Sequence, residues 1–135
     1  MLRLAALFMF LVSLTGAGCA GAEPAATPAP AEVSGTVRLT PGESVASAGH
    51  VVRFVEVVED SRCPQDVTCV TEGVARIRIA VDDQTAVLTV PGSRPTDGDR
   101  STVTVGRLTV AVTGLEPVPV SSGPREAPVA VIDVR

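Results

Sequence analysis

The chain has 135 residues and a formal net charge of −4, and its charged residues are scattered rather than grouped. All 11 basic residues are arginines, and 15 acidic residues outnumber them. This composition disfavours a nucleic-acid partner, for which a basic face supplies most of the affinity. It equally disfavours peripheral binding to an anionic membrane surface.

The first 18 residues are predicted to be a secretory signal peptide. Arg3 precedes an apolar run from Leu4 to Leu14, which is too short for a helix that crosses a bilayer of roughly 30 Å. Small residues follow the run, and this order is typical of an export signal. Removal of Arg3 with the signal leaves ten arginines against 15 acidic residues, a net charge of −5.

Residues 15–19, Thr-Gly-Ala-Gly-Cys, resemble the lipobox of bacterial lipoproteins, in which the cysteine is acylated and becomes the new N-terminus. Gly16 stands where leucine is usual, so ordinary cleavage after Ala22 is an alternative. Three cysteines in an exported chain leave one unpaired, and a lipid on Cys19 leaves Cys63 and Cys69 as a pair. The resemblance implies a membrane anchor in the bacterial cell envelope, on its periplasmic or extracellular face, with secretion as the alternative.

Residues 19–32 are predicted to be a disordered tether. After Cys19 they are almost all alanine, glycine and proline, with two glutamates, and they offer little apolar surface to bury. A proline-rich spacer reaches about 3 Å per residue, so this one can hold a domain up to roughly 40 Å from a membrane. Residues 33–135 are expected to form a single small domain.

The apolar residues of this domain repeat with a period of two, which indicates β-strands. Phe54 is the only aromatic residue of the domain, so its core must be aliphatic, and β-branched side chains favour pleated sheets. Strands are expected at 33–39, 50–60, 73–81, 85–90, 101–105, 107–120 and 129–135. We therefore predict an all-β domain, an antiparallel sandwich or a partly open barrel of six or seven strands.

Two of these strands carry specific expectations. The strand at 50–60 is predicted to be covered on both faces at its centre, with Val52, Phe54 and Val58 on one side and Val51, Val55 and Val57 on the other. The strand at 73–81 alternates, so Arg76 and Arg78 should point to water. Residues 74–90 are predicted to form a hairpin that turns at Asp82 and Asp83.

Residues 59–73, EDSRCPQDVTCVTEG, hold two cysteines that suit a redox centre, a metal site or a disulfide. A redox centre is usually Cys-x-x-Cys near a βαβ pattern, and neither is present. Zinc takes four ligands, and beyond Cys63, Cys69 and His50 the domain has no nitrogen or sulfur donor of this kind, while Cu(I) would require reduced thiolates outside the cytosol. In an exported chain a disulfide is favoured, and closing this loop contributes about 2.4 kcal/mol on the chain-entropy argument. Cys63 is expected to lie where one strand ends and Cys69 where the next strand begins.

The same segment resembles an uncharacterised family of small bacterial lipoproteins and secreted proteins. The similar stretches are VVEDSRCPQDVTCV, running on to EGVARIRI, and VGRLTVAVTGLEPVP, which is similar to the penultimate strand of that family. The resemblance covers about residues 45–134, and Thr71 stands where the family has tryptophan. It implies an all-β fold and the Cys63–Cys69 disulfide, and it carries no activity.

The function expected from these observations is non-catalytic: a lipid-anchored envelope protein that is a binding or structural module for an unknown envelope protein or small ligand. A disulfide-braced loop is preorganised for binding, so one alternative is a protease-type inhibitor acting through residues 63–69. A metal-binding envelope protein is a further alternative. The candidate binding loop consists of Pro64, Gln65, Asp66, Val67 and Thr68.

Other chemistry-bearing residues give weaker signals, and we predict no enzyme, no cofactor and no metal site. His50 is the only histidine, and a general base needs a nucleophile and an orienting carboxylate, yet no Gly-x-Ser-x-Gly elbow is present. Asp97-Gly98-Asp99 is similar to part of a calcium loop but lacks its further acidic positions, so a turn is expected.

Overall fold

The computed structural model describes residues 29–94, 96–124 and 126–135, so the predicted signal, Cys19 and residues 20–28 of the tether lie outside the described residues. Among the described residues, eight strands form two four-stranded antiparallel sheets, and there is no helix. The strands are β1 (Gly35–Leu39), β2 (Ser44–Ser47), β3 (His50–Asp60), β4 (Ala75–Val81), β5 (Gln84–Thr89), β6 (Thr102–Val105), β7 (Leu108–Glu116) and β8 (Val129–Val134).

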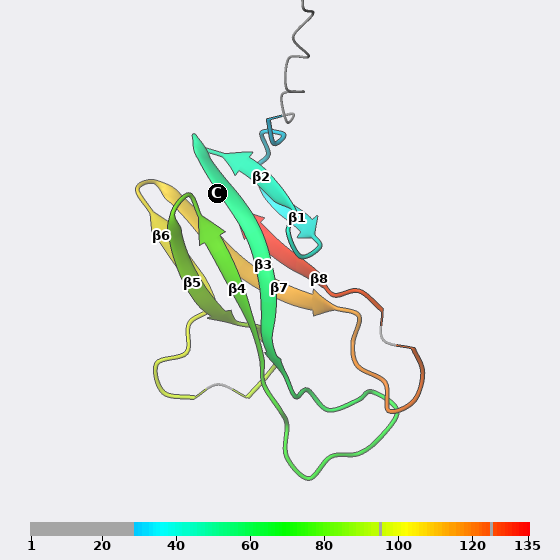
Figure 1. The fold of residues 1–135 in the computed structure, drawn as a ribbon. Helices are drawn as coiled ribbons and strands as arrows, with labels where there is room; N and C mark the ends of the chain where they lie inside the picture. The colour runs from blue at the N-terminus through cyan, green and yellow to red at the C-terminus, as the bar shows by residue number, and fades with distance from the viewer. Residues whose placement is uncertain (1–28, 95, 125) are drawn as a thin grey trace, which may run out of the picture.

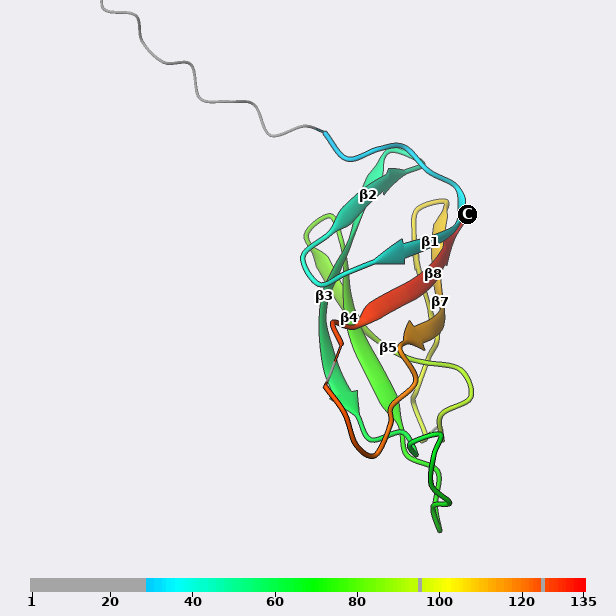
Figure 2. The same cartoon turned by 90° about the vertical axis from the view of Figure 1, so that its right-hand side faces the viewer.

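The two sheets stack face to face as a sandwich (Figures 1 and 2). Sheet A has the order β2-β3-β4-β5, and sheet B has the order β1-β8-β7-β6. The all-β prediction is confirmed, but the sheets do not close into a barrel and the strands number eight rather than six or seven. The strand that the sequence did not reveal is β2, because Ser-Val-Ala-Ser is too short to show alternation.

The core lies between the sheets and is almost entirely aliphatic. β4 supplies the clearest case, since its inward residues Ala75, Ile77, Ile79 and Val81 are all buried, as their alternation predicted. Phe54 is the largest fully buried side chain. The other buried members of the cluster are Leu39, Val52, Ala86, Leu88, Val90, Leu108, Val110, Val112, Leu115, Ala130, Ile132 and Val134.

β3 is not covered on both faces, and this corrects the expectation for residues 50–60. Its pairing with β4 shifts register between Phe54 and Glu56 and again between Val57 and Glu59. Each bulge inserts one extra residue. The side chains that follow it therefore point to the opposite face from the one that strict alternation predicts. As a result Val57 packs against the core, whereas Val58 is 44% exposed. Val51, on the outer face, is 37% exposed.

Three long loops between strands gather at one end of the sandwich: one within each sheet and one that crosses from sheet A to sheet B. We define the loop end as the three loops 61–74, 90–101 and 117–128, drawn at the bottom of Figure 1. The described chain begins and ends at the opposite end of the domain (Figure 1). There the last part of the predicted tether lies against β2: the Val33 amide donates to the Ala46 carbonyl at 2.8 Å, and the Ala46 amide donates to the Ala31 carbonyl at 3.0 Å.

Replacing Phe54 by alanine is expected to lower the free energy of unfolding by about 3–5 kcal/mol, because the side chain is fully buried between the sheets. Val58→Ala in the same strand should change it by less than about 0.5 kcal/mol, since the bulges turn Val58 to the solvent. Urea unfolding of both variants measures the difference. A large loss from Val58→Ala would show that β3 lacks these bulges.

Candidate binding surface at the loop end

The 61–74 loop is closed at its base by Ser61 and Val74. The Ser61 amide donates to the Val74 carbonyl at 2.8 Å, and the Ser61 hydroxyl accepts from the Val74 amide at 3.0 Å. Gly73 lies directly beside this closure, and a Cβ at Gly73 would lie only 1.6 Å from the Ser61 carbonyl oxygen. Ser61 and Gly73 therefore determine the shape of the loop at its base, and only glycine fits at position 73.

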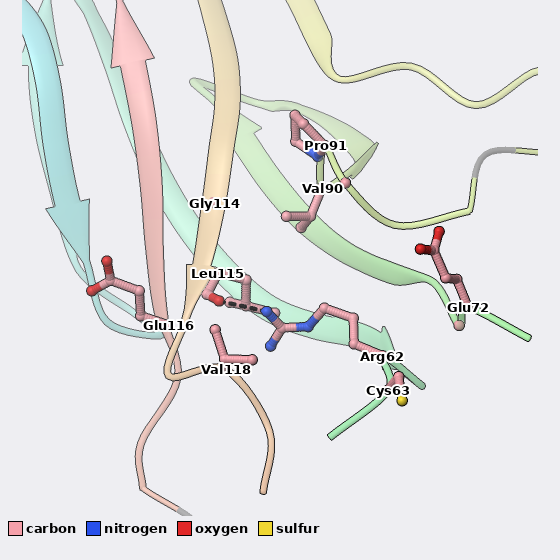
Figure 3. Close-up of a pocket in the computed structure, with 11 residues that line it drawn as sticks. Arg62, Cys63, Glu72, Val90, Pro91, Gly114, Leu115, Glu116 and Val118 are labelled. Carbon is pink, nitrogen blue, oxygen red and sulfur yellow. Dashed lines mark hydrogen bonds between the residues drawn. The ribbon is translucent and has the colours of Figure 1, made fainter. Parts of the chain in front are cut away.

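Arg62 connects the two sheets at the loop end. Its side chain is only 15% exposed, and its Nε and Nη2 donate to the two carboxylate oxygens of Asp60, each at 2.7 Å. The guanidinium also donates to the carbonyls of Leu115 at 2.7 Å and Pro117 at 3.1 Å, at the end of β7. Figure 3 shows the guanidinium directed at Leu115. Arg62 therefore joins the end of a sheet A strand to the end of a sheet B strand.

The Cys63–Cys69 disulfide is present, as predicted, with its two Cα atoms 5.9 Å apart. The expectation that Cys63 ends one strand and Cys69 begins the next is wrong, because β3 ends at Asp60 and β4 begins at Ala75. Both cysteines lie within the 61–74 loop. The ladder stops before them because the Arg62 amide donates to the Asp60 carboxylate at 3.3 Å rather than to the facing strand.

The candidate binding loop is not free at every residue. The Gln65 amide donates to the Pro119 carbonyl at 3.0 Å, and one carboxylate oxygen of Asp66 accepts from the Ser121 amide at 2.8 Å. The Ser121 hydroxyl donates to the other oxygen. The hydrogen bond from the Ser121 hydroxyl contributes most, and that from the Ser121 amide next, to holding the pKa of Asp66 below its ordinary value. Asp66 therefore anchors this loop to the 117–128 loop, while Val67 and Thr68 remain exposed.

The third loop is attached to the same structure. The Arg94 amide donates to the Gly73 carbonyl at 3.0 Å, which connects the 90–101 loop to the 61–74 loop. Arg76 donates to Asp99 at 3.1 and 3.2 Å and to Thr96 Oγ1 at 2.9 Å. These hydrogen bonds fix the position of the 90–101 loop against the outer face of sheet A.

Arg76 lies on the outer face of β4 as predicted, but the expected exposure to water is wrong: its side chain is only 21% exposed, and it also donates to Glu59 at 2.5 Å. The Arg76 guanidinium, followed by the amide and hydroxyl of Thr96, holds the pKa of Asp99 far below its usual range. The turn expected at residues 97–99 is present, because the Asp99 amide donates to the Thr96 carbonyl at 3.0 Å. Among the described residues, no group of three or more His, Cys, Asp or Glu side chains is placed to hold a metal ion.

The surface of the loop end is rich in exposed valine. Of the seven large apolar residues that are exposed in the described part of the chain, four lie there, Val67, Val70, Val118 and Val120, and Val70 is fully exposed. An open cleft of about 440 Å³ runs between the sheets beneath these loops (Figure 3). Its lining includes Arg62, Cys63, Glu72, Val90, Leu115 and Val118. Because the Arg62 guanidinium is already bonded to Asp60 and to two carbonyls, this surface offers mainly apolar contact.

His50 lies at the opposite end of the domain, where it begins β3 as expected. Its Nδ1 is 2.7 Å from the Asp82 carboxylate, whose other oxygen accepts from the Val51 amide at 2.9 Å. Its Nε2 faces Gly106, 3.5 Å from where a Cβ would lie. The hydrogen bond from His50, followed by that from Val51, lowers the pKa of Asp82. The pair thereby holds the β4–β5 turn, and within the described residues no serine, threonine or cysteine side chain hydrogen-bonds to the His50 ring.

No protein-family model, curated protein or solved structure matches the chain. The fold and the loop end define its class, an antiparallel β-sandwich domain whose three loops at one end are held together by a disulfide and by hydrogen bonds between loops. The resemblance to the lipoprotein family stays a prediction. Within the described residues, no helix has the length and apolar character needed to span a bilayer.

Replacing Gly73 by alanine is expected to lower the free energy of unfolding by about 3 kcal/mol, because its Cβ would overlap the Ser61 carbonyl and open the base of the loop. Gly114→Ala is the matched control, since its Cβ would make ordinary contact with Val131 at 3.7 Å. Thermal unfolding of the two variants tests the difference. Equal effects would contradict the close approach at Gly73.

The Ser121 amide proton should report the ionisation of Asp66. Since the pKa of Asp66 is lowered in the fold, its bonds to Ser121 should be intact above the ordinary aspartate value of about 3.9 and be lost as the pH falls through the lower folded value. We expect the amide chemical shift of Ser121 to titrate with a midpoint below about 3.9. Asp66→Asn should abolish this titration, and Asp97→Asn should leave it unchanged. A midpoint at or above the ordinary value would show that the two loops are not joined in this way.

Proposed function

We propose that this protein is a non-catalytic, lipid-anchored protein of the bacterial cell envelope that binds a partner protein through its loop end. The observation that carries the proposal is the attachment of the disulfide loop to both neighbouring loops. Gln65 and Asp66 join it to the 117–128 loop, and Gly73 joins it to the 90–101 loop. The described residues thus present one fixed surface built from three loops.

Fixed loops favour binding because association otherwise costs about 0.5–1.5 kcal/mol for each flexible side chain that becomes ordered. The exposed valines of the loop end add apolar contact area, which characterises the buried centre of protein interfaces. The other three exposed valines, Val51, Val58 and Val87, lie in strands of sheet A. The concentration of apolar surface on the loops therefore supports this end of the domain as the contact region.

The position of the chain termini supports the same orientation. The described chain enters the domain at the end opposite the loops (Figures 1 and 2). A lipid on Cys19 followed by a tether would therefore hold the loop end away from the membrane that carries the anchor. A partner in the envelope space, rather than the lipid surface itself, suits that placement.

Inhibition of a protease is the second candidate function, favoured by the way the 61–74 loop extends beyond the rest of the domain (Figure 1). The structure changes which residues would act. Because Asp66 and the Gln65 amide are occupied within the domain, a protease would meet Val67, Thr68 and Val70. The metal-binding alternative gains no support from the cysteines, whose sulfurs are joined to each other.

Site-specific photocross-linking in the native host tests the proposed function. A photoreactive residue at Val70 should give a discrete adduct with one partner, whereas the same residue at Val51, an exposed valine of sheet A, should not. In parallel, mass spectrometry should find an acyl group on Cys19, and Cys19→Ser should move the protein from the membrane to the soluble fraction.

Two results would contradict the proposal separately. Identical cross-links from both positions, or none from Val70, would remove the loop end as a binding surface. An unmodified Cys19 in membrane-derived protein would remove the lipid anchor and leave the binding surface standing. If the adduct contains a protease whose inhibition is lost with Val70→Asp, the second candidate function is the correct one.

A further inference from the structure

We infer that the free edge of β5 pairs with the β5 edge of a second copy of this chain, forming an antiparallel dimer. An edge strand presents unpaired backbone N–H and C=O groups that can add a further strand. β5 ends sheet A on one side, and its only strand neighbour is β4. The inference concerns a surface other than the loop end and does not depend on the proposed function.

The hairpin geometry determines which β5 groups face outward. Asp82 and Asp83 form a two-residue turn, so Val81 and Gln84 are a hydrogen-bonded pair, and the pattern alternates from there. Ala86 and Leu88 therefore bond to β4, while Thr85, Val87 and Thr89 direct their backbone groups outward. The Thr89 amide confirms this direction, because it donates to the Arg100 carbonyl at 2.8 Å.

The other described edges are protected over more of their length than β5, which Arg100 covers at Thr89 and leaves open at Thr85 and Val87. Residues 31–33 bond along the edge of β2, and β6 has only four residues. β1 carries the charged Arg38, paired with Glu116. Charges, short strands and covering segments are the usual means by which proteins keep an edge from pairing. β5 has six residues, Gln-Thr-Ala-Val-Leu-Thr, with no charge and no proline.

The charges at the two ends of the edge favour a second copy in the antiparallel direction. With Ala86 opposite Ala86 of the second copy, Thr85 and Val87 exchange backbone hydrogen bonds across the interface. In this register the position opposite Thr89 of the second copy is already taken by Arg100, whose carbonyl accepts from the Thr89 amide at 2.8 Å, so the ladder ends there and Asp83 meets Arg100. Asp83 and Arg100 are both exposed and make no ion pair among the described residues. The pairing thus places opposite charges together at both ends, and Val87 contacts Thr85 on the outer face.

The contact is small, so we expect a reversible dimer with a dissociation constant on the order of 10 μM or weaker. Antiparallel pairing reverses one copy relative to the other, which places the two N-terminal ends at opposite ends of the dimer. β3, with 11 residues, gives the domain a length of about 36 Å at about 3.3 Å per residue. A proline-rich segment over residues 19–30 reaches about 35 Å, so two anchored copies can pair above one membrane when the strands of the dimer lie along its surface, with neither loop end turned toward the lipid.

Sedimentation velocity of the exported Cys19→Ser chain, from about 1 μM to about 1 mM, tests the dimer in the concentration range where a contact of this size should form. Asp83→Arg alone and Arg100→Asp alone should each raise the dissociation constant by about tenfold, since each places two like charges at both ends of the interface. The double variant Asp83→Arg/Arg100→Asp should return it to within about twofold, because the ion pairs are restored in reverse. Glu72→Arg, an equal charge change at the loop end, should have no effect.

Val87→Pro supplies an independent test of the backbone pairing. Proline cannot donate from the outward-facing position, yet the hydrogen bonds from β5 to β4 do not involve that N–H. We expect a folded monomer, with the fold checked by circular dichroism. A wild-type chain that stays monomeric at every concentration would overturn the inference. A dimer that is unaffected by the single charge changes would also overturn it, as would a dimer that the double variant does not restore. Both outcomes can be read from the charge variants alone, even if Val87→Pro fails to fold.

Discussion

The arrangement of the loop end depends on the guanidinium group of Arg62. It stands between Asp60 at the end of β3 and two carbonyls at the end of β7, so it joins the sheets where their strands separate. The disulfide loop begins one residue after Arg62, and the segment that receives it begins at Pro117. The disulfide closes a short ring, but it does not determine where that ring lies against the domain. Arg62 and the Asp66–Ser121 contact fix that position.

Alternation along one strand was enough to predict β4 and the β4–β5 hairpin, because the apolar and polar residues of β4 separate cleanly between its two faces. β3 could not be predicted in the same way. Its valines occupy both faces, and the residues that face the core are decided by bulges in its register with β4. β2 could not be predicted for a different reason. It has only four residues and one strongly apolar side chain, so its sequence shows no alternation.

At the loop end, the cysteine count was enough to predict the disulfide, but the contacts that orient it join residues far apart in the chain. Arg62 and Leu115 are 53 positions apart, and Asp66 and Ser121 are 55 apart. No local pattern marks such pairs. Arg76 shows the same effect, because strand alternation directs it outward correctly but does not reveal Glu59 and Asp99 beside it. The residues of the motif Asp-Ser-Arg-Cys-Pro therefore support the loop and attach it to the neighbouring strands.

The two surfaces proposed for this domain, the loop end for a partner and the β5 edge for a second copy, restrict how the domain can contact other molecules. The loop end lies beyond the strands, whereas the β5 edge runs along the side of sheet A, so a dimer through β5 leaves both loop ends uncovered. Since antiparallel pairing reverses one copy, the two loop ends point in opposite directions. Such a dimer connects two partner molecules rather than binding one partner twice. Avidity toward a single partner requires both sites to be reached at once, and this geometry prevents it. The dimer therefore suits a connecting role between partners more than a gain in affinity for one.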